Sequence, residues 1–240
     1  MLSLNRTSIS DAGLAHLQGL DCLEELELGR TNVTDAGLNH VAHLHKLRVL
    51  NLAETAVGDV GMAHLKDLTS LEELHVGPGP TITGLIHLVG LTLLKELPIS
   101  TEEMSDSDLV VVGRFVGLES LHLSGRAIGD AGVSHLQGLT RLKELSLRDT
   151  SVTDGGMASV AMLLGLENLF FDGTAIGGAG LAYLKGLPKL NALILDGTEV
   201  DDGSLRHLAD HHRLYCLSLG NTMVGDAGLT HLGHLDNLGS

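Results

Sequence analysis

A leucine pair separated by one residue returns along the chain at a nearly constant interval. Every step between copies is 24 residues long except one of 23, and ten copies stay in phase over the 240 residues. The copies are Leu2/Leu4, Leu26/Leu28, Leu50/Leu52, Leu74/Val76, Leu97/Ile99, Leu121/Leu123, Leu145/Leu147, Leu169/Phe171, Leu193/Leu195 and Leu217/Leu219. A period of this length indicates a stack of small structural units that share one core.

Each repeat is predicted to form a short strand, a turn and a short helix. In the L-x-L pattern the leucines point to one side of the strand and the variable residues to the other. A threonine follows in most copies, and we interpret it as an internal hydrogen-bonding ladder for the turn backbone. An aspartate then opens segments such as "DAGL", where we predict that it caps the helix. The threonines are Thr7, Thr31, Thr55, Thr150, Thr174, Thr198 and Thr222, and the aspartates are Asp11, Asp35, Asp59, Asp106, Asp130, Asp154, Asp202 and Asp226.

Stacking of the repeats predicts an α/β solenoid. One repeat cannot bury its leucines alone, whereas neighbouring repeats together form a continuous core. Parallel strands lie about 4.8 Å apart and a helix is about 10 Å wide, so the helices force the stack to curve. We therefore predict a single domain over 1–240, an arc or horseshoe of about ten repeats. Its parallel sheet lies on the concave face and its short helices lie on the convex face.

The repeats resemble leucine-rich repeats, with the pattern L-x-x-L-x-L-x-x-T-x-V-x-D-x-G-L-x-x-L-x-x-L over nearly the whole chain. Segments such as "TNVTDAGLNHV" and "TSVTDGGMASV" are similar to bacterial and protozoan repeats. They are also similar to the cysteine-containing repeats of F-box proteins, with threonine in the cysteine or asparagine slot. The resemblance implies a concave face that binds a partner protein, and it brings no catalytic motif.

Residues 77–108 depart from the repeat. The short step falls at "HVGPGPTITGL", with Pro78 and Pro80 where a turn is expected, and Pro98 lies inside the next predicted strand. Because proline removes a donor from the strand ladder, we expect the sheet to be irregular here. Decay of one repeat and a functional kink or contact loop are both open interpretations.

Neither end shows the polar capping unit that normally covers the terminal leucines of a solenoid. The chain opens inside a predicted strand and stops at "LDNLGS", just before another strand is due. We expect the sequence to be a fragment of a longer chain. The alternative is that the exposed ends stack on another molecule, which includes end-to-end self-association.

The charge narrows the classes of partner. Acidic residues outnumber basic ones by 30 to 15, which gives a formal charge of −15. Nucleic acid and anionic membrane surfaces should be repelled, and a basic partner is favoured. The sequence shows neither a signal peptide nor an apolar stretch long enough to span a membrane. The compartment stays unknown, with the cytoplasm slightly favoured.

Histidines form the most visible cluster of chemically active side chains. They recur in one helical slot, and His207 and His211 stand one helical turn apart. Two imidazoles on one face could hold a metal. We interpret the histidines instead as half-buried spacers copied with the repeat, and predict no metal, no cofactor and no enzymatic activity. The slot holds His16, His40, His64, His87, His135, His207 and His231.

The candidate partner-binding residues lie on or beside the concave face. Phe170 and Ile194 are adjacent apolar residues on a mostly polar sheet, with Tyr215 predicted near them, and such a pair is a plausible anchor. Asp172 and Asp196 follow in neighbouring "DGT" turns. Their carboxylates either attract a basic group or cation, or bond their own turn backbone. The full candidate set is Phe170, Ile194, Tyr215, Arg148, Asp149, Asp172, Asp196, His122, His75 and Glu27.

These observations favour a non-catalytic scaffold that binds a protein or peptide on the concave face of repeats six to ten. The alternative is the substrate-recognition part of a ubiquitin-ligase-like F-box assembly. That role would need a helical adaptor-binding segment outside the repeats.

Overall fold

The computed structural model describes residues 1–97 and 103–239. The chain forms two compact units, Met1–Ser100 and Thr101–Ser240, and each is described by itself. The prediction of a single domain over 1–240 stays a prediction.

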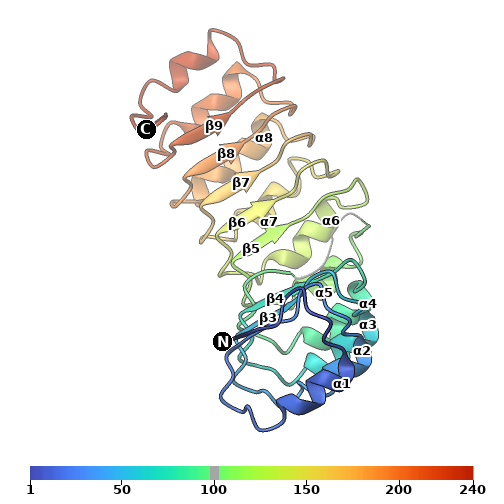
Figure 1. Cartoon of the computed structure of the whole chain (residues 1–240). Coiled ribbons are helices and arrows are strands. Elements are labelled where there is room, and N and C mark those ends of the chain that lie inside the picture. The colour runs from blue at the N-terminus through green and yellow to red at the C-terminus, as the bar shows by residue number, and fades with distance from the viewer. Residues whose placement is uncertain (98–102, 240) are drawn as a thin grey trace. The chain divides into compact units, whose positions relative to one another are not determined.

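The first unit contains a four-stranded parallel sheet in the order β1-β2-β3-β4. Successive strands pair in a 24-residue register, so Leu26 lies opposite Leu50, and Leu50 lies opposite Leu74. Short helices, most of them extended by a 3-10 turn, connect the strands (Figure 1). The strands are β1 (Leu2–Ser3), β2 (Glu25–Glu27), β3 (Val49–Leu52) and β4 (Glu73–Val76), and the helices are α1 (Asp11–Leu14), η1 (Ala15–Leu17), α2 (Asp35–Leu38), α3 (Asp59–Met62), η2 (Ala63–Leu65), α4 (Ile82–Leu85) and η3 (Ile86–Leu88).

The second unit repeats this design around a five-stranded parallel sheet in the order β5-β6-β7-β8-β9. Figure 1 shows these strands side by side, with the helices gathered on the other face of the sheet. The strands are β5 (Ser120–His122), β6 (Glu144–Ser146), β7 (Asn168–Phe170), β8 (Ala192–Ile194) and β9 (Cys216–Ser218). The helices are α5 (Leu109–Val112), α6 (Asp130–Val133), η4 (Ser134–Leu136), α7 (Met157–Val160), α8 (Gly178–Leu181), η5 (Ala182–Gly186), η6 (Asp202–Leu208) and η7 (Gly228–His231).

The core lies between the sheet and the helices of each unit. Leu145, Leu169 and Leu193 follow one another across neighbouring strands and are fully buried. The residues that alternate with them point to the opposite side of the sheet, which we call the strand face. The predicted strand, turn and short helix of each repeat are confirmed on both sides of the undescribed segment.

The threonine ladder is also confirmed. The hydroxyl of Thr31 donates to the carbonyl of Leu28 at 2.7 Å, and that of Thr174 donates to the carbonyl of Phe171 at 2.6 Å. The same bond, from each threonine to the residue three positions earlier, recurs at Thr7, Thr55, Thr150, Thr198 and Thr222. These hydroxyls all donate hydrogen bonds to the backbone of the turn.

The predicted role of the repeat aspartates was wrong in one respect. Asp35 is the first residue of α2, and Thr34 before it occupies the cap position without a side-chain cap bond. The Asp35 carboxylate instead accepts from the backbone N–H of Gly58, which precedes the next helix, at 2.6 Å. Asp11, Asp59, Asp106, Asp130, Asp154 and Asp202 make the corresponding bond. The aspartates therefore join each repeat to its successor.

Within the described residues no strand lies between Val76 and Ser120, and each sheet stays within its own unit. Pro98 and Ile99 lie outside the described residues, so the irregularity expected over 77–108 stays a prediction. No helix in 1–97 or 103–239 is long and apolar enough to cross a membrane.

The turn after the strands adopts the left-handed backbone conformation at one repeated position. Gly125, Gly173 and Gly197 occupy it with φ of 104°, 68° and 68°. In other repeats a residue other than glycine occupies this position, with φ between 54° and 58°. These residues are Arg6, Arg30, Glu54, Asp149 and Asn221. The conformation therefore belongs to the repeat and not to one residue type.

Candidate functional site

The strand face of the second unit carries the two apolar residues selected from the sequence. Phe170 on β7 lies opposite Ile194 on β8, with Ser146 on β6 beside Phe170 and Ser218 on β9 beside Ile194. Phe170 and Ile194 are half-buried, whereas Ser146 is buried. The register thus brings an aromatic ring and an aliphatic side chain together between two serines.

Arg148 covers part of this pair. The central carbon of its guanidinium lies 4.8 Å from the centroid of the Phe170 ring, which is a cation–π contact. Its Nε lies 3.0 Å from Oδ2 of Asp172. Three of the candidate residues therefore form one cluster, in which Asp172 holds the guanidinium and Arg148 shields the ring.

The other aspartates are placed differently. Asp196 accepts from the hydroxyl of Ser218, at 2.7 and 2.9 Å to its two oxygens, and from the backbone N–H of Gly220. Its carboxylate is thus used internally, although its partners belong to the following repeat and not to its own turn. Asp149 is exposed at the left-handed turn position, with φ of 54°.

Tyr215 and His122 lie away from the apolar pair. Tyr215 precedes β9, and its backbone N–H donates to the carbonyl of Asn191, so it stands in a different row from Ile194. Its side chain is 48% exposed. His122 shares the row of Ser146, and its Nε2 lies 2.9 Å from Oε1 of Glu144.

Glu27 and His75 belong to the strand face of the first unit. Oε2 of Glu27 accepts from the side-chain amides of Asn5 at 3.1 Å and Asn51 at 2.7 Å, which ties three successive repeats together. His75 is exposed on β4, opposite Asn51. The ten candidate residues therefore divide between the two units.

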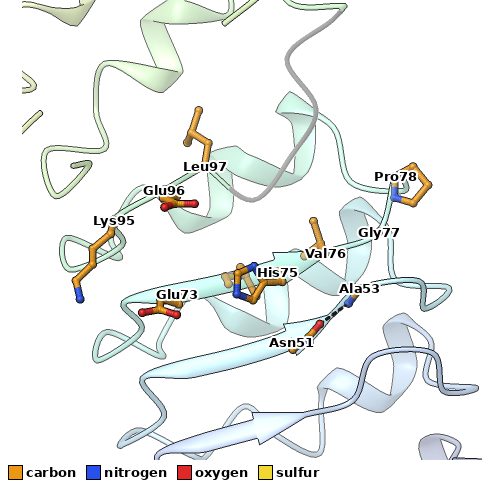
Figure 2. Close-up of a pocket in the computed structure, with 11 residues that line it drawn as sticks. Asn51, Ala53, Glu73, His75, Val76, Gly77, Pro78, Lys95, Glu96 and Leu97 are labelled. Carbon is orange, nitrogen blue, oxygen red and sulfur yellow. Dashed lines mark hydrogen bonds between the residues drawn. The ribbon is translucent and has the colours of Figure 1, made fainter. Parts of the chain in front are cut away.

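A pocket of about 780 Å³ lies beside β4 in the first unit. Figure 2 shows Glu73 and His75 on β4 and Glu96 on the segment that follows the next helix. Val76 and Leu97 provide apolar wall. Of these residues only His75 was a candidate predicted from the sequence. Glu73 and Glu96 occupy equivalent positions across the 23-residue step, and that spacing was the available signal.

The histidines show no metal-binding arrangement. Within 1–97 and 103–239, no group of three or more His, Cys, Asp or Glu side chains is placed to hold a metal ion. Nδ1 of His207 and Nε2 of His211 are buried without a hydrogen-bond partner among the described residues. Burial lowers the pKa of both imidazoles below the ordinary value.

Comparison with known proteins agrees with the repeat. A family model described as a leucine-rich repeat matches residues 43–66. No curated protein matches the sequence.

Solved structures share the fold at low sequence identity. An internalin from Listeria monocytogenes is 22% identical with a TM-score of 0.68, and the match covers 99% of this chain and 78% of the internalin. A leucine-rich-repeat protein of Leptospira interrogans is 19% identical with a TM-score of 0.66, covering 98% of this chain and 59% of that one. A structure described as a TDR receptor is 16% identical with a TM-score of 0.63, covering 99% and 45%. At these identities the likeness shows the fold alone.

The 24-residue period, the matching family model and the shared architecture converge on one assignment. The chain has the leucine-rich-repeat fold, and residues 43–66 match the leucine-rich-repeat family model.

Proposed function

We propose that this chain is a non-catalytic scaffold that binds a protein or peptide segment on the strand face of its second unit. Leucine-rich-repeat folds generally mediate protein–protein interaction. The single observation that supports this surface is the register that sets Phe170 beside Ile194, both half-buried, on a face whose other residues are mostly small or polar. Aromatic and aliphatic side chains of this kind form the energetic centre of many interfaces.

The cluster around Phe170 also suggests how binding would proceed. Arg148 is exposed, so a partner side chain can displace it from the ring while it keeps its ion pair with Asp172. The partner would then cover Phe170 and Ile194 with an apolar group. Asp149 remains exposed beside this surface and favours a basic residue next to that apolar group.

The test uses peptides selected against the whole chain by phage display. For the tightest peptide, we expect Phe170→Ser and Ile194→Ser each to weaken binding by about tenfold or more, as fluorescence polarisation would show. Serine stands naturally at the neighbouring positions Ser146 and Ser218, so the strands should still form.

A matched control is Tyr183→Ser in η5, which removes an aromatic side chain that is 45% exposed on a helix. This variant should bind with unchanged affinity. Equal affinity of the Phe170→Ser variant and the wild-type chain, with thermal melting showing that both are folded, would refute the assignment of this surface.

Self-association is a separate part of the proposal. The last described repeat exposes Met223 to 64% and Leu229 to 59%, so its apolar surface is available to a second copy. Light scattering coupled to size exclusion should then show a mass that grows with protein concentration. A constant monomer mass over the accessible range would remove this part and leave peptide binding unaffected.

The F-box alternative has no comparable support. It needs a helical adaptor-binding segment, and every helix within residues 1–97 and 103–239 belongs to a repeat.

A further inference from the structure

We propose that the pocket beside β4 binds the side chain of an arginine or lysine presented by a protein partner. The site lies in the first unit and does not depend on the proposed surface around Phe170. Its volume of about 780 Å³ is in the range of small-ligand sites and is more than large enough for one basic side chain.

Two carboxylates at the rim provide the charge that such a side chain requires. Glu73 on β4 and Glu96 on the adjacent segment are both exposed and line the pocket. The backbone N–H of Lys95 donates to the carbonyl of Glu72, which aligns Glu96 with Glu73 (Figure 2). This bond holds the segment of Glu96 beside the end of β4, although the segment is not a strand of the sheet, and one cation can then face both carboxylates.

Nothing among the described residues neutralises these two charges. Neither the Glu73 nor the Glu96 side chain has a hydrogen bond or ion pair within 1–97 and 103–239. The nearby Lys95 ammonium instead lies 2.5 Å from Oε2 of Glu72, which also binds Arg48. Glu72 therefore engages the lining lysine, and Glu73 with Glu96 leave a negative rim.

The wall of the pocket suits the rest of a basic side chain. Leu74 is buried in the floor, and Val76 and Leu97 are half-buried beside it. Arginine and lysine carry three or four methylene groups that pack on apolar surface while the charged tip stays at a polar rim. His75 on β4 adds a flat ring against which a guanidinium can stack.

Other ligand classes fit less well. A divalent cation needs more carboxylate or imidazole ligands than are placed together here, since no group of three is found among the described residues. An anion would meet the two glutamates directly. A purely apolar side chain would leave both carboxylates without a counter-charge.

The test titrates the isotope-labelled full chain by NMR with a capped pentapeptide that has one central arginine among alanines. The matched probe replaces arginine by citrulline, which keeps the shape and removes the charge. We expect saturable shifts at the backbone amides of Glu73, His75 and Glu96 with the arginine peptide, and none with the citrulline peptide. Because the whole chain is acidic, scattered non-saturating shifts with the arginine peptide would overturn the proposal.

Variants identify the carboxylates. Glu73→Gln and Glu96→Gln should each weaken arginine-peptide binding by about threefold or more, and the double variant should abolish the shifts. Glu25→Gln is the control, because Glu25 occupies the position of Glu73 two strands away and does not line the pocket. Equal binding by the double variant and the Glu25→Gln control would overturn the proposal, while Phe170→Ser should bind this probe normally.

Discussion

The Asp59 carboxylate accepts from the backbone N–H groups of Thr81 and Gly84 and from the Thr81 hydroxyl, at 2.7, 3.0 and 2.8 Å. One side chain in α3 thus satisfies polar groups of the following repeat. Burial on its own would raise the pKa of Asp59, but these hydrogen bonds outweigh it and lower the pKa below its ordinary value. Such a carboxylate stabilises the fold at neutral pH, and its contribution is lost as the pH falls through the lowered pKa.

We expect Asp59→Ala to lower the free energy of unfolding by about 1–3 kcal/mol, because it leaves the N–H groups of Thr81 and Gly84 without their acceptor. Urea unfolding at pH 7 measures the change. Asp67→Ala is the control, since Asp67 is exposed in the same repeat. A midpoint for Asp59→Ala as high as that of the control would show that water replaces the carboxylate at no cost.

The burial of His211 predicts that the chain loses stability in mild acid. Its side chain is 7% exposed and Nε2 has no partner among the described residues. Burial lowers the pKa of this imidazole, Asp210 opposes the shift and His212 adds to it. Below pH 6.5 the unfolded chain therefore takes up a proton before the folded chain does, and folding loses free energy as the pH falls.

The urea midpoint should accordingly fall between pH 7 and pH 5, and His211→Gln should make that fall shallower. His135→Gln changes an exposed histidine in the helical slot of His207, and it should leave the slope unchanged. Parallel slopes for wild type and His211→Gln would mean that the imidazole reaches water in the folded chain.

At the scale of the element, the helices pack closely because a glycine faces the preceding repeat. A Cβ added at Gly132 in α6 would lie 2.4 Å from Oδ1 of Asp106 and 2.9 Å from Cδ1 of Leu109. The same carboxylate oxygen of Asp106 accepts from the N–H of Gly129. A side chain at Gly132 would therefore disturb both the packing and the bond between repeats.

Gly132→Ala should destabilise the chain by about 1–3 kcal/mol despite the better helix propensity of alanine. Thermal unfolding followed by circular dichroism measures this effect. Gly138→Ala makes the same chemical change where the added Cβ meets nothing nearer than 3.8 Å, and it should be neutral. Equal melting temperatures for the two variants would contradict the close packing of α6.

The elements themselves could be predicted from the sequence, and their connections only in part. The strands follow from the period of Leu145, Leu169 and Leu193, and each threonine bonds a residue three positions earlier. Both features could therefore be predicted from the sequence. The partner of Asp35 is Gly58, which is 23 residues away, and local capping rules do not describe it. The 23-residue step predicts that Glu96 aligns with Glu73, but the pattern does not predict that Glu72, and not the rim carboxylates, binds the Lys95 ammonium.

For the candidate binding residues, too, the position on the sheet could be predicted from the sequence, whereas the side-chain contacts could not. The adjacency of Phe170 and Ile194 followed from the period, because equivalent positions of successive repeats pair in a parallel sheet. The cation–π contact of Arg148 and the internal bonds of Asp196 depend on side-chain conformations, which the sequence pattern leaves undetermined. Tyr215 was expected near the pair, but it stands in the row of Asn191.

Across the whole molecule, charge should govern colloidal behaviour. The formal charge is −15 with neutral histidines, and protonation of all 14 would leave only −1. The electrostatic repulsion that opposes association between copies at pH 7 therefore nearly vanishes close to the isoelectric point of about 5.2. Light scattering should show stronger attraction between copies at pH 5.2 than at pH 7.5, and added salt should reduce the difference. Equal behaviour at both pH values would contradict this account.

Substitutions at the left-handed turn position could raise the thermal stability of the chain. Arg6, Arg30, Glu54 and Asp149 adopt there a conformation that costs an L-residue about 1–2 kcal/mol and that glycine accepts freely. The same turn forms whether glycine or a larger residue occupies the position. Replacing each of these residues by glycine, which is already present at Gly173 and Gly197, should raise the melting temperature step by step. The changes fall in both units, and none of them alters a strand. A stabilised variant of this kind could then tolerate the destabilising substitutions that redesign of a binding surface usually requires.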